Sequence, residues 1–146
     1  MKERICIGSD HAGYHLKERV KVVLEEMGYG VVDFGTDGES SVDYPDFIHP
    51  LASAISRGEY GRGVIICGSG NGVSMTANKY RGIRAALCWN GEIAALARMH
   101  NDANILALPA RYVIDDEAFG IVEIFLSTPF EGGRHQTRVE KINITT

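Results

Sequence analysis

Short apolar runs alternate along this chain with longer segments whose apolar residues recur at helical spacing. Residues 5–8 form a compact apolar run, which predicts a strand. Residues 14–27 follow it with apolar side chains on one helical face, which predicts an amphipathic helix. Gly28 is placed to end that helix, because glycine readily adopts the left-handed conformation that follows many helices.

The same alternation continues to the end of the chain. Four further strands are predicted, at residues 31–34, 64–67, 85–88 and 105–108. Four further helices are predicted, over residues 45–58, from 72 towards 79, over 92–99 and over 117–126. Asp115 and Asp116 are placed to cap the last of these helices. Residues 131–146 are expected to form a partly helical tail after Pro129.

Five strands that alternate with helices in 146 residues are typical of a doubly wound α/β protein. The continuous apolar run at residues 64–67 indicates a strand buried on both faces. Right-handed crossovers favour a three-layer α/β/α sandwich around a parallel five-stranded sheet. We expect a flavodoxin-like or Rossmann-like sheet of strand order 2-1-3-4-5, in a single domain that spans residues 1–146.

The expected topology also predicts where a ligand binds. In such sheets the site lies at the carboxyl ends of the strands that flank the switch point. Here these are the first and third strands, which lead into Ser9-Asp10-His11 and into residues 67–72, Cys-Gly-Ser-Gly-Asn-Gly. We therefore expect a functional site between these two strand ends.

Composition narrows the class of function. The chain has 15 Lys and Arg against 19 Asp and Glu, a net charge of −4, which argues against general nucleic-acid binding. Its apolar runs are far shorter than the roughly 18 residues that cross a bilayer. The first residues do not resemble a signal peptide, so we expect a cytoplasmic protein without a membrane partner. The three cysteines form no C-x-x-C pair, so we expect neither disulfides nor a metal site.

A glycine-rich turn follows the third predicted strand. The chain has 17 glycines, whereas average usage would give roughly ten, and Gly68, Gly70 and Gly72 alternate within this one turn. Successive N–H groups in such a turn can converge on an anion. A dinucleotide-binding fingerprint would need glycine at Val73, and a P-loop would end in Gly-Lys-Ser/Thr. An anion-binding nest remains, with a simple tight turn as the structural alternative.

Cys67 ends the third predicted strand directly before this turn. Amide donors and a following helix N-terminus would stabilise a thiolate there, so Cys67 is a candidate base or nucleophile. Buried strand cysteines are usually inert, and position alone leaves that alternative open. Cys6 and Cys88 have no such turn after them and are expected in the core.

Histidines and an aspartate mark two other candidate positions. His11 could bind phosphate or move protons, while Asp10 could orient a hydroxyl group or cap the first helix. His100 ends the fourth predicted helix, where a histidine is also favourable for purely structural reasons. Its functional and structural interpretations are equal alternatives at this point.

Residues 132–138 concentrate positive charge in an otherwise acidic chain. If this segment is helical, Arg134 and Arg138 lie one turn apart on the same face and repel each other without an anion. A clamp on a phosphate group explains the pair better than a solvated face does. Arg111, just after the fifth predicted strand, is expected to join this clamp.

Five stretches, in the family's order, resemble the type B ribose-5-phosphate isomerases, whose family also includes galactose-6-phosphate and allose-6-phosphate isomerases. They are SDHAG (9–13), DYPDF (43–47), CGSGNGVSMTANKYRGIRAA (67–86), RMHNDANIL (98–106) and GGRHQTR (132–138). The resemblance covers essentially the whole chain. It implies an aldose–ketose isomerase of the pentose phosphate pathway, which interconverts ribose 5-phosphate and ribulose 5-phosphate through a cis-enediolate without a cofactor.

The resemblance also implies a role for each matching residue. Cys67 matches the general base, and His100 matches the acid that opens the sugar ring. Ser69 and Asp10 match catalytic positions near the sugar oxygens. The remaining substrate-binding positions are the nest residues Gly68, Gly70, Asn71 and Gly72, and the phosphate-binding residues His11, Asn101, Arg111, Arg134 and Arg138.

Two positions depart from the family pattern. Ser69 stands where threonine is common, and Val73 stands where some members carry a glutamate base. Family members are dimers or larger, with sites shared between subunits. The resemblance therefore implies a homodimer or homotetramer in which the tail, residues 129–146, packs on a partner subunit. The same chemistry on a six-carbon sugar phosphate and a non-catalytic sugar-phosphate sensor are the alternatives.

Overall fold

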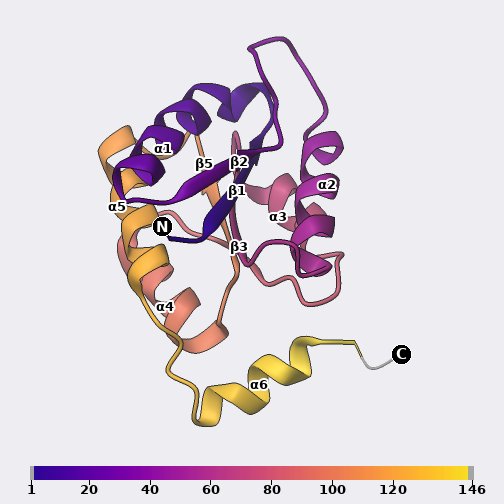
Figure 1. Ribbon diagram of the computed structural model, residues 1–146, viewed down its shortest axis with the longest axis vertical. Helices are drawn as coiled ribbons and strands as arrows, with labels where there is room; N and C mark the ends of the chain where they lie inside the picture. The colour runs from indigo at the N-terminus through magenta and orange to yellow at the C-terminus, as the bar shows by residue number, and fades with distance from the viewer. Residues whose placement is uncertain (1, 145–146) are drawn as a thin grey trace.

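The computed structural model describes residues 2–144, which fold around one parallel β-sheet (Figure 1). Its strands are β1 (Arg4–Ser9), β2 (Gly30–Asp33), β3 (Arg62–Cys67), β4 (Ala85–Leu87) and β5 (Ile105–Pro109). Each neighbouring pair in the sheet is parallel. The predicted five-stranded parallel sheet is confirmed.

Helices cover both faces of this sheet. They are the 3₁₀ turn η1 (His11–Gly13), α1 (Tyr14–Glu26), α2 (Tyr44–Ser56), α3 (Asn71–Ala77), α4 (Gly91–Asn101), α5 (Asp115–Ser127) and α6 (Arg134–Ile142). Helices α1, α4 and α5 bury apolar side chains against one face, and α2 and α3 against the other (Figure 1). The three-layer α/β/α fold is therefore confirmed. Among residues 2–144, no helix has the length and apolar character needed to cross a membrane.

The strand order differs from the prediction at one edge of the sheet. The observed order is β2-β1-β3-β5-β4, so the predicted order 2-1-3-4-5 is wrong in its last two strands. Every residue of β5 is buried, whereas β4 has only three residues and each is partly exposed. A fully buried apolar strand is stabilised at the centre of a sheet, and a short, partly exposed one is suited to the edge.

This order determines what lies beside the end of β3. Because Cys67 pairs with Pro109, the chain that leaves β5 runs next to the chain that leaves β3. The N–H of Ala110 donates to the carbonyl of Cys67 at 2.9 Å, and the N–H of Arg111 donates to the carbonyl of Gly68 at 3.0 Å. The corrected topology therefore brings Arg111 to the glycine-rich turn.

The helix ends agree with the sequence in most places. Gly28 follows α1 with a φ of +93°, in the left-handed region that glycine adopts without strain. Helix α5 begins at Asp115, so Asp115 and Asp116 lie inside its first turn rather than capping it, which corrects the prediction. Their charges still lie at the positive end of the helix dipole, because the whole first turn shares that potential.

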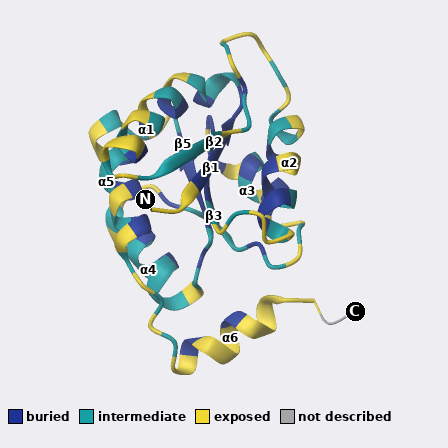
Figure 2. Ribbon diagram, viewed as in Figure 1, coloured by how far each residue is buried: buried dark blue, intermediate teal, exposed yellow. Residues whose placement is uncertain are grey.

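The C-terminal arm, residues 128–142, leaves the body of the molecule and carries α6 along one end of the sheet (Figure 1). Only His135 and Val139 of α6 are buried, and the rest of the helix is exposed (Figure 2). The predicted partly helical tail is thus confirmed over Arg134–Ile142. An amphipathic helix with so little of its surface covered gains little stability from its own chain.

Candidate active site

A polar cavity of about 420 Å³ opens at the carboxyl ends of β1 and β3. This is the switch point of the sheet, where a ligand site was expected. The cavity is lined by seven of the residues singled out from the sequence, Asp10, His11, Cys67, Gly68, Ser69, Gly72 and Arg111. These side chains come from separate segments of the chain, and the parallel sheet brings them together.

The glycine-rich turn is shaped by close packing on two sides. Gly70 has a φ of +78°, and a Cβ there would lie 2.4 Å from Cδ1 of Leu87. A Cβ on Gly72 would lie 2.4 Å from Cζ of Tyr44. Both distances are far below van der Waals contact, so a side chain at either position would force the turn or the neighbouring Leu87 or Tyr44 side chain to move. Gly68, Ser69 and Gly72 of the turn line the cavity, whereas the N–H groups of Gly70 and Asn71 donate to Sγ of Cys67 and Oγ of Ser69.

Cys67 differs from the other two cysteines in its surroundings. Burial raises the pKa of the Cys6 thiol to about 12 and that of the Cys88 thiol to about 12. Both lie in the core, as predicted. Cys67 is also buried, but it lines the cavity, and its Sγ accepts the N–H of Gly70 at 3.2 Å. A sulfur that accepts an amide hydrogen bond beside a cavity is placed to act as a base.

Asp10 and His11 form the opposite wall. Asp10 caps η1, since its Oδ1 accepts the N–H of Gly13 at 3.1 Å, so the structural interpretation of this residue is confirmed. Its carboxylate also lines the cavity. Nδ1 of His11 accepts the N–H of Val42 at 3.2 Å, and a neutral His11 therefore carries its proton on Nε2.

Arg111 supplies positive charge beside the turn. Its guanidinium packs against the backbone of Gly68, where an added Cβ would lie 3.0 Å from Nη1. Sequence reasoning missed two aromatic neighbours that line the same cavity, Tyr44 and Tyr112. The available signals were weak: Tyr44 stands directly before the helix-starting Pro45, and Tyr112 directly follows Arg111.

The other predicted residues lie elsewhere. Asn71 begins α3 behind the turn and faces a neighbouring surface depression. His100 and Asn101 end α4, which starts beyond the carboxyl end of β4 and runs back for 11 residues, or about 16 Å. They therefore lie towards the amino ends of the strands. Arg134 and Arg138 are exposed on α6, and neither pairs with an acidic side chain in the part of the chain that the structure describes.

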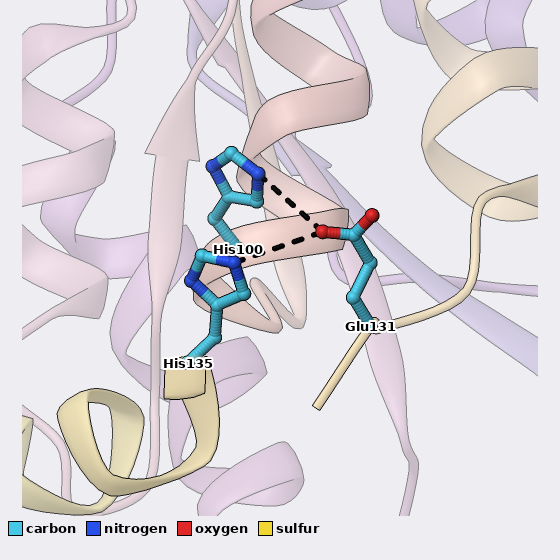
Figure 3. Close-up of side chains that lie close together, drawn as sticks. All are labelled: His100, Glu131 and His135. Carbon is cyan, nitrogen blue, oxygen red and sulfur yellow. Dashed lines mark ion pairs between the residues drawn. The ribbon is translucent and has the colours of Figure 1, made fainter. Parts of the chain in front are cut away.

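One group of side chains in residues 2–144 could hold a metal ion by proximity alone. The ligand atoms of His100, Glu131 and His135 all lie within 4.8 Å of one another (Figure 3). The cluster lies where α4 meets the C-terminal arm, away from the cavity. The sequence predicted no metal site and did not foresee this cluster.

The fold and the cavity together define an α/β protein with a polar ligand site at the switch point of its sheet. The sequence profile of the ribose/galactose isomerase family matches residues 5–142, and the chain belongs to that family. It is thereby an aldose–ketose isomerase.

Two solved structures and a curated relative agree with this assignment. Ribose-5-phosphate isomerase B of Clostridium thermocellum is 55% identical, with a TM-score of 0.93 over 95% of this chain and 94% of that one. The enzyme of Mycoplasma genitalium, solved with bound ribulose-5-phosphate, is 44% identical, with a TM-score of 0.93 over 97% and 95% of the two chains. Ribose-5-phosphate isomerase B of Escherichia coli is 44% identical over 96% of this chain and 94% of its own length.

Proposed function

We propose that this protein interconverts ribose 5-phosphate and ribulose 5-phosphate, with Cys67 as the general base. The observation that carries the proposal is the position of the Cys67 sulfur, in the cavity and hydrogen-bonded to the glycine-rich turn. The bound ribulose-5-phosphate in the Mycoplasma genitalium relative supports the choice of a five-carbon substrate.

The reaction follows from this arrangement. A thiolate at Cys67 removes the proton from C2 of the open-chain aldose, and the electron pair forms a C1–C2 double bond with negative charge on O1. The same thiol returns the proton to C1 while the proton on O2 moves to O1, which gives the ketose. Amide N–H groups of Gly68, Ser69 and Gly72, the turn residues that line the cavity, stabilise the enediolate, and one such donor contributes about 3 kcal/mol in comparable sites.

The remaining groups bind the sugar phosphate. Asp10 and Ser69 contact the sugar hydroxyls, and His11 and Arg111 contribute to the phosphate site from the same cavity. All the reacting groups in this scheme are protein groups, so it requires no cofactor. His100 is the acid that opens the furanose ring.

This scheme requires a second copy of the chain because of where four of its residues lie. They are His100, Asn101, Arg134 and Arg138. All four lie outside the cavity of their own chain. The two arginines are exposed on a helix that is itself mostly uncovered. We therefore propose a homodimer, or a tetramer of such dimers, in which the arm of one subunit completes the cavity of its partner.

The direct test compares kcat/KM for ribose 5-phosphate, allose 6-phosphate and galactose 6-phosphate. We expect the five-carbon substrate to be preferred by at least about tenfold, because one misplaced group in a closed site costs 1–3 kcal/mol. Activity should be unchanged in excess EDTA. A higher kcat/KM for either six-carbon substrate would overturn the choice of sugar, and binding without turnover would overturn the enzymatic proposal itself.

A further inference from the structure

Three titratable side chains meet where the C-terminal arm joins α4 (Figure 3). The rings of His100 and His135 stack with centroids 4.2 Å apart and planes inclined by 13°. Oε1 of Glu131 lies 3.5 Å from Nε2 of His100 and 3.7 Å from Nε2 of His135. One carboxylate oxygen therefore faces both imidazoles from the same side.

The backbone holds this cluster in place. The N–H of Glu131 donates to the carbonyl of Met99 at 3.1 Å, and Nε of Arg98 donates to the carbonyl of Thr128 at 3.1 Å. These bonds fix the start of the arm against the last turn of α4, one residue before His100. The main chain of Glu131 is thus fixed beside His100, although its side chain is half-exposed.

After Glu131, a turn at two glycines brings His135 beside the Glu131 carboxylate. Gly132 and Gly133 have φ angles of +69° and +56°, in the left-handed region that other residues rarely adopt. Their turn leads directly into α6 and places His135 in its first turn, with only 9% of the residue exposed. The Gly-Gly pair therefore serves the stacking of His135 on His100.

The ring geometry distinguishes two uses of this cluster. A shared metal ion needs nitrogen lone pairs that converge on one point. In two nearly parallel stacked rings the in-plane lone pairs of the two Nε2 atoms run side by side, which does not suit a common ion. A carboxylate that fixes the orientation of a working histidine is a frequent arrangement in proteins.

We propose that Glu131 and His135 are positioning residues that hold the imidazole of His100 for opening the sugar ring. The inference rests on the proposed function, in which His100 is the ring-opening acid. Glu131 faces Nε2 and limits rotation of the ring, and the flat face of His135 supports it from one side. His100 itself is 39% exposed at its side chain, so it has few other contacts to hold it.

The charges around His135 are consistent with this division of roles. Burial, followed by the nearby His100 and Arg134, lowers the pKa of His135, and the attraction of Glu131 only partly opposes them. The lowered pKa favours the neutral form of the His135 ring near neutral pH. The negative charge of Glu131 remains available to His100.

The test separates ring opening from enediolate formation. Ribulose 5-phosphate has no ring to open, so exchange of its C1 proton for deuterium in D₂O, followed by NMR, reports Cys67 chemistry alone. For Glu131→Gln we expect kcat for ribose 5-phosphate to fall about ten- to a hundredfold, with C1 exchange within about twofold of wild type. His135→Phe, which keeps a flat ring, should retain more isomerisation than His135→Ala.

Matched controls make the outcome decisive. Glu140→Gln makes the same chemical change on the exposed side of α6 and should alter neither rate. If Glu131→Gln lowers exchange and isomerisation equally, or lowers neither, the positioning role is wrong. If wild-type protein catalyses neither reaction, the proposed function fails instead. If His100→Asn loses isomerisation and Glu131→Gln does not, only the present inference fails.

Discussion

The cavity at the carboxyl end of the sheet and the C-terminal arm hold their functional residues in different ways. Cys67 is the last residue of a central strand, and Asp10 directly follows another, so both are fixed by the sheet and buried. Arg134 and Arg138 lie on a short helix that is mostly exposed (Figure 2). The arm therefore has a defined start at α4 and an uncovered end.

This difference assigns different tasks to the two regions. Proton transfer at carbon needs groups held within a fraction of an ångström, which a packed core provides. Binding a phosphate needs charge and hydrogen-bond donors, which long arginine side chains on an exposed helix can supply. A helix with an uncovered charged face can also serve a neighbouring subunit, whereas a strand end buried in its own core cannot.

The largest effect is expected when each region is inactivated in a separate variant and the two variants are then mixed. Cys67→Ala removes the proposed base, and His100→Asn removes the proposed ring-opening acid, so each variant alone should lose about 10²- to 10⁴-fold in kcat. If the site is shared, mixed dimers of the two variants contain one intact site. Refolding an equal mixture should then restore about a quarter of wild-type activity, because about half of the dimers are hybrids with one of two sites intact.

The control for this experiment is Cys88→Ala, which removes a core thiol outside the cavity and should keep near-wild-type kcat. Near-wild-type turnover in Cys67→Ala would contradict the proposed base. A mixture that stays inactive, although mass spectrometry detects hybrid dimers, would place both groups within one chain and contradict the shared site.

A smaller effect is expected at the end of the arm where we propose that phosphate binds. Arg138→Ala should raise KM for ribose 5-phosphate about tenfold to a hundredfold with little change in kcat, because a hydrogen bond to a charged group contributes about 1.5–3 kcal/mol. Lys141→Ala, on the last turn of the same helix, is the matched control and should leave KM unchanged. An unaltered KM in the double variant Arg134→Ala/Arg138→Ala would show that the arm does not bind phosphate.

The cavity could be predicted from the sequence because local patterns determine it. A continuous apolar run gives β3, the alternating glycines give the turn, and parallel topology joins that turn to Asp10. The order of β4 and β5 was wrong because it depends on the relative burial of two apolar segments, which no local pattern encodes. Tyr44 was missed for the same reason: its ring reaches Gly72 through tertiary packing of α2 on α3.

The arm was only partly predictable. The spacing of Arg134 and Arg138 indicated a charged helix, and the structure has one. The contact of Glu131 with His100 depends on the path of residues 128–133, which is set by main-chain bonds to α4 and by two glycines with positive φ. This path brings together positions about 30 residues apart, and the spacing of apolar residues along the sequence does not predict such a contact.

Outside the cavity, an ion cluster joins α1 to the end of β2, and its loss should affect stability and not catalysis. Oδ2 of Asp33 lies 2.6 Å from Nζ of the fully buried Lys17 and 2.8 Å from Nζ of Lys21. Its Oδ1 accepts the N–H of Gly35 at 2.8 Å. Burial of Asp33 tends to raise its pKa, but these hydrogen bonds outweigh it and hold the pKa below the usual value. Folding therefore favours the charged form of the Asp33 carboxylate, and that charge stabilises the folded state.

The smallest expected effect follows from that shift. Asp33→Asn should lower the free energy of unfolding at pH 7 by about 1 kcal/mol, a modest value because the carboxylate is partly open to solvent. The wild-type advantage is fully present above the unfolded pKa of about 3.9 and is lost as pH falls through the lower folded value.

Urea unfolding at pH 7 and at pH 2 measures both limits, with the exposed Asp37→Asn as control. A deficit that persists unchanged at pH 2 would mean that Asp33 stabilises through shape and not charge. A change in KM would mean that this ion cluster and the cavity are coupled. Arg138→Ala, by contrast, should alter KM and leave unfolding unchanged.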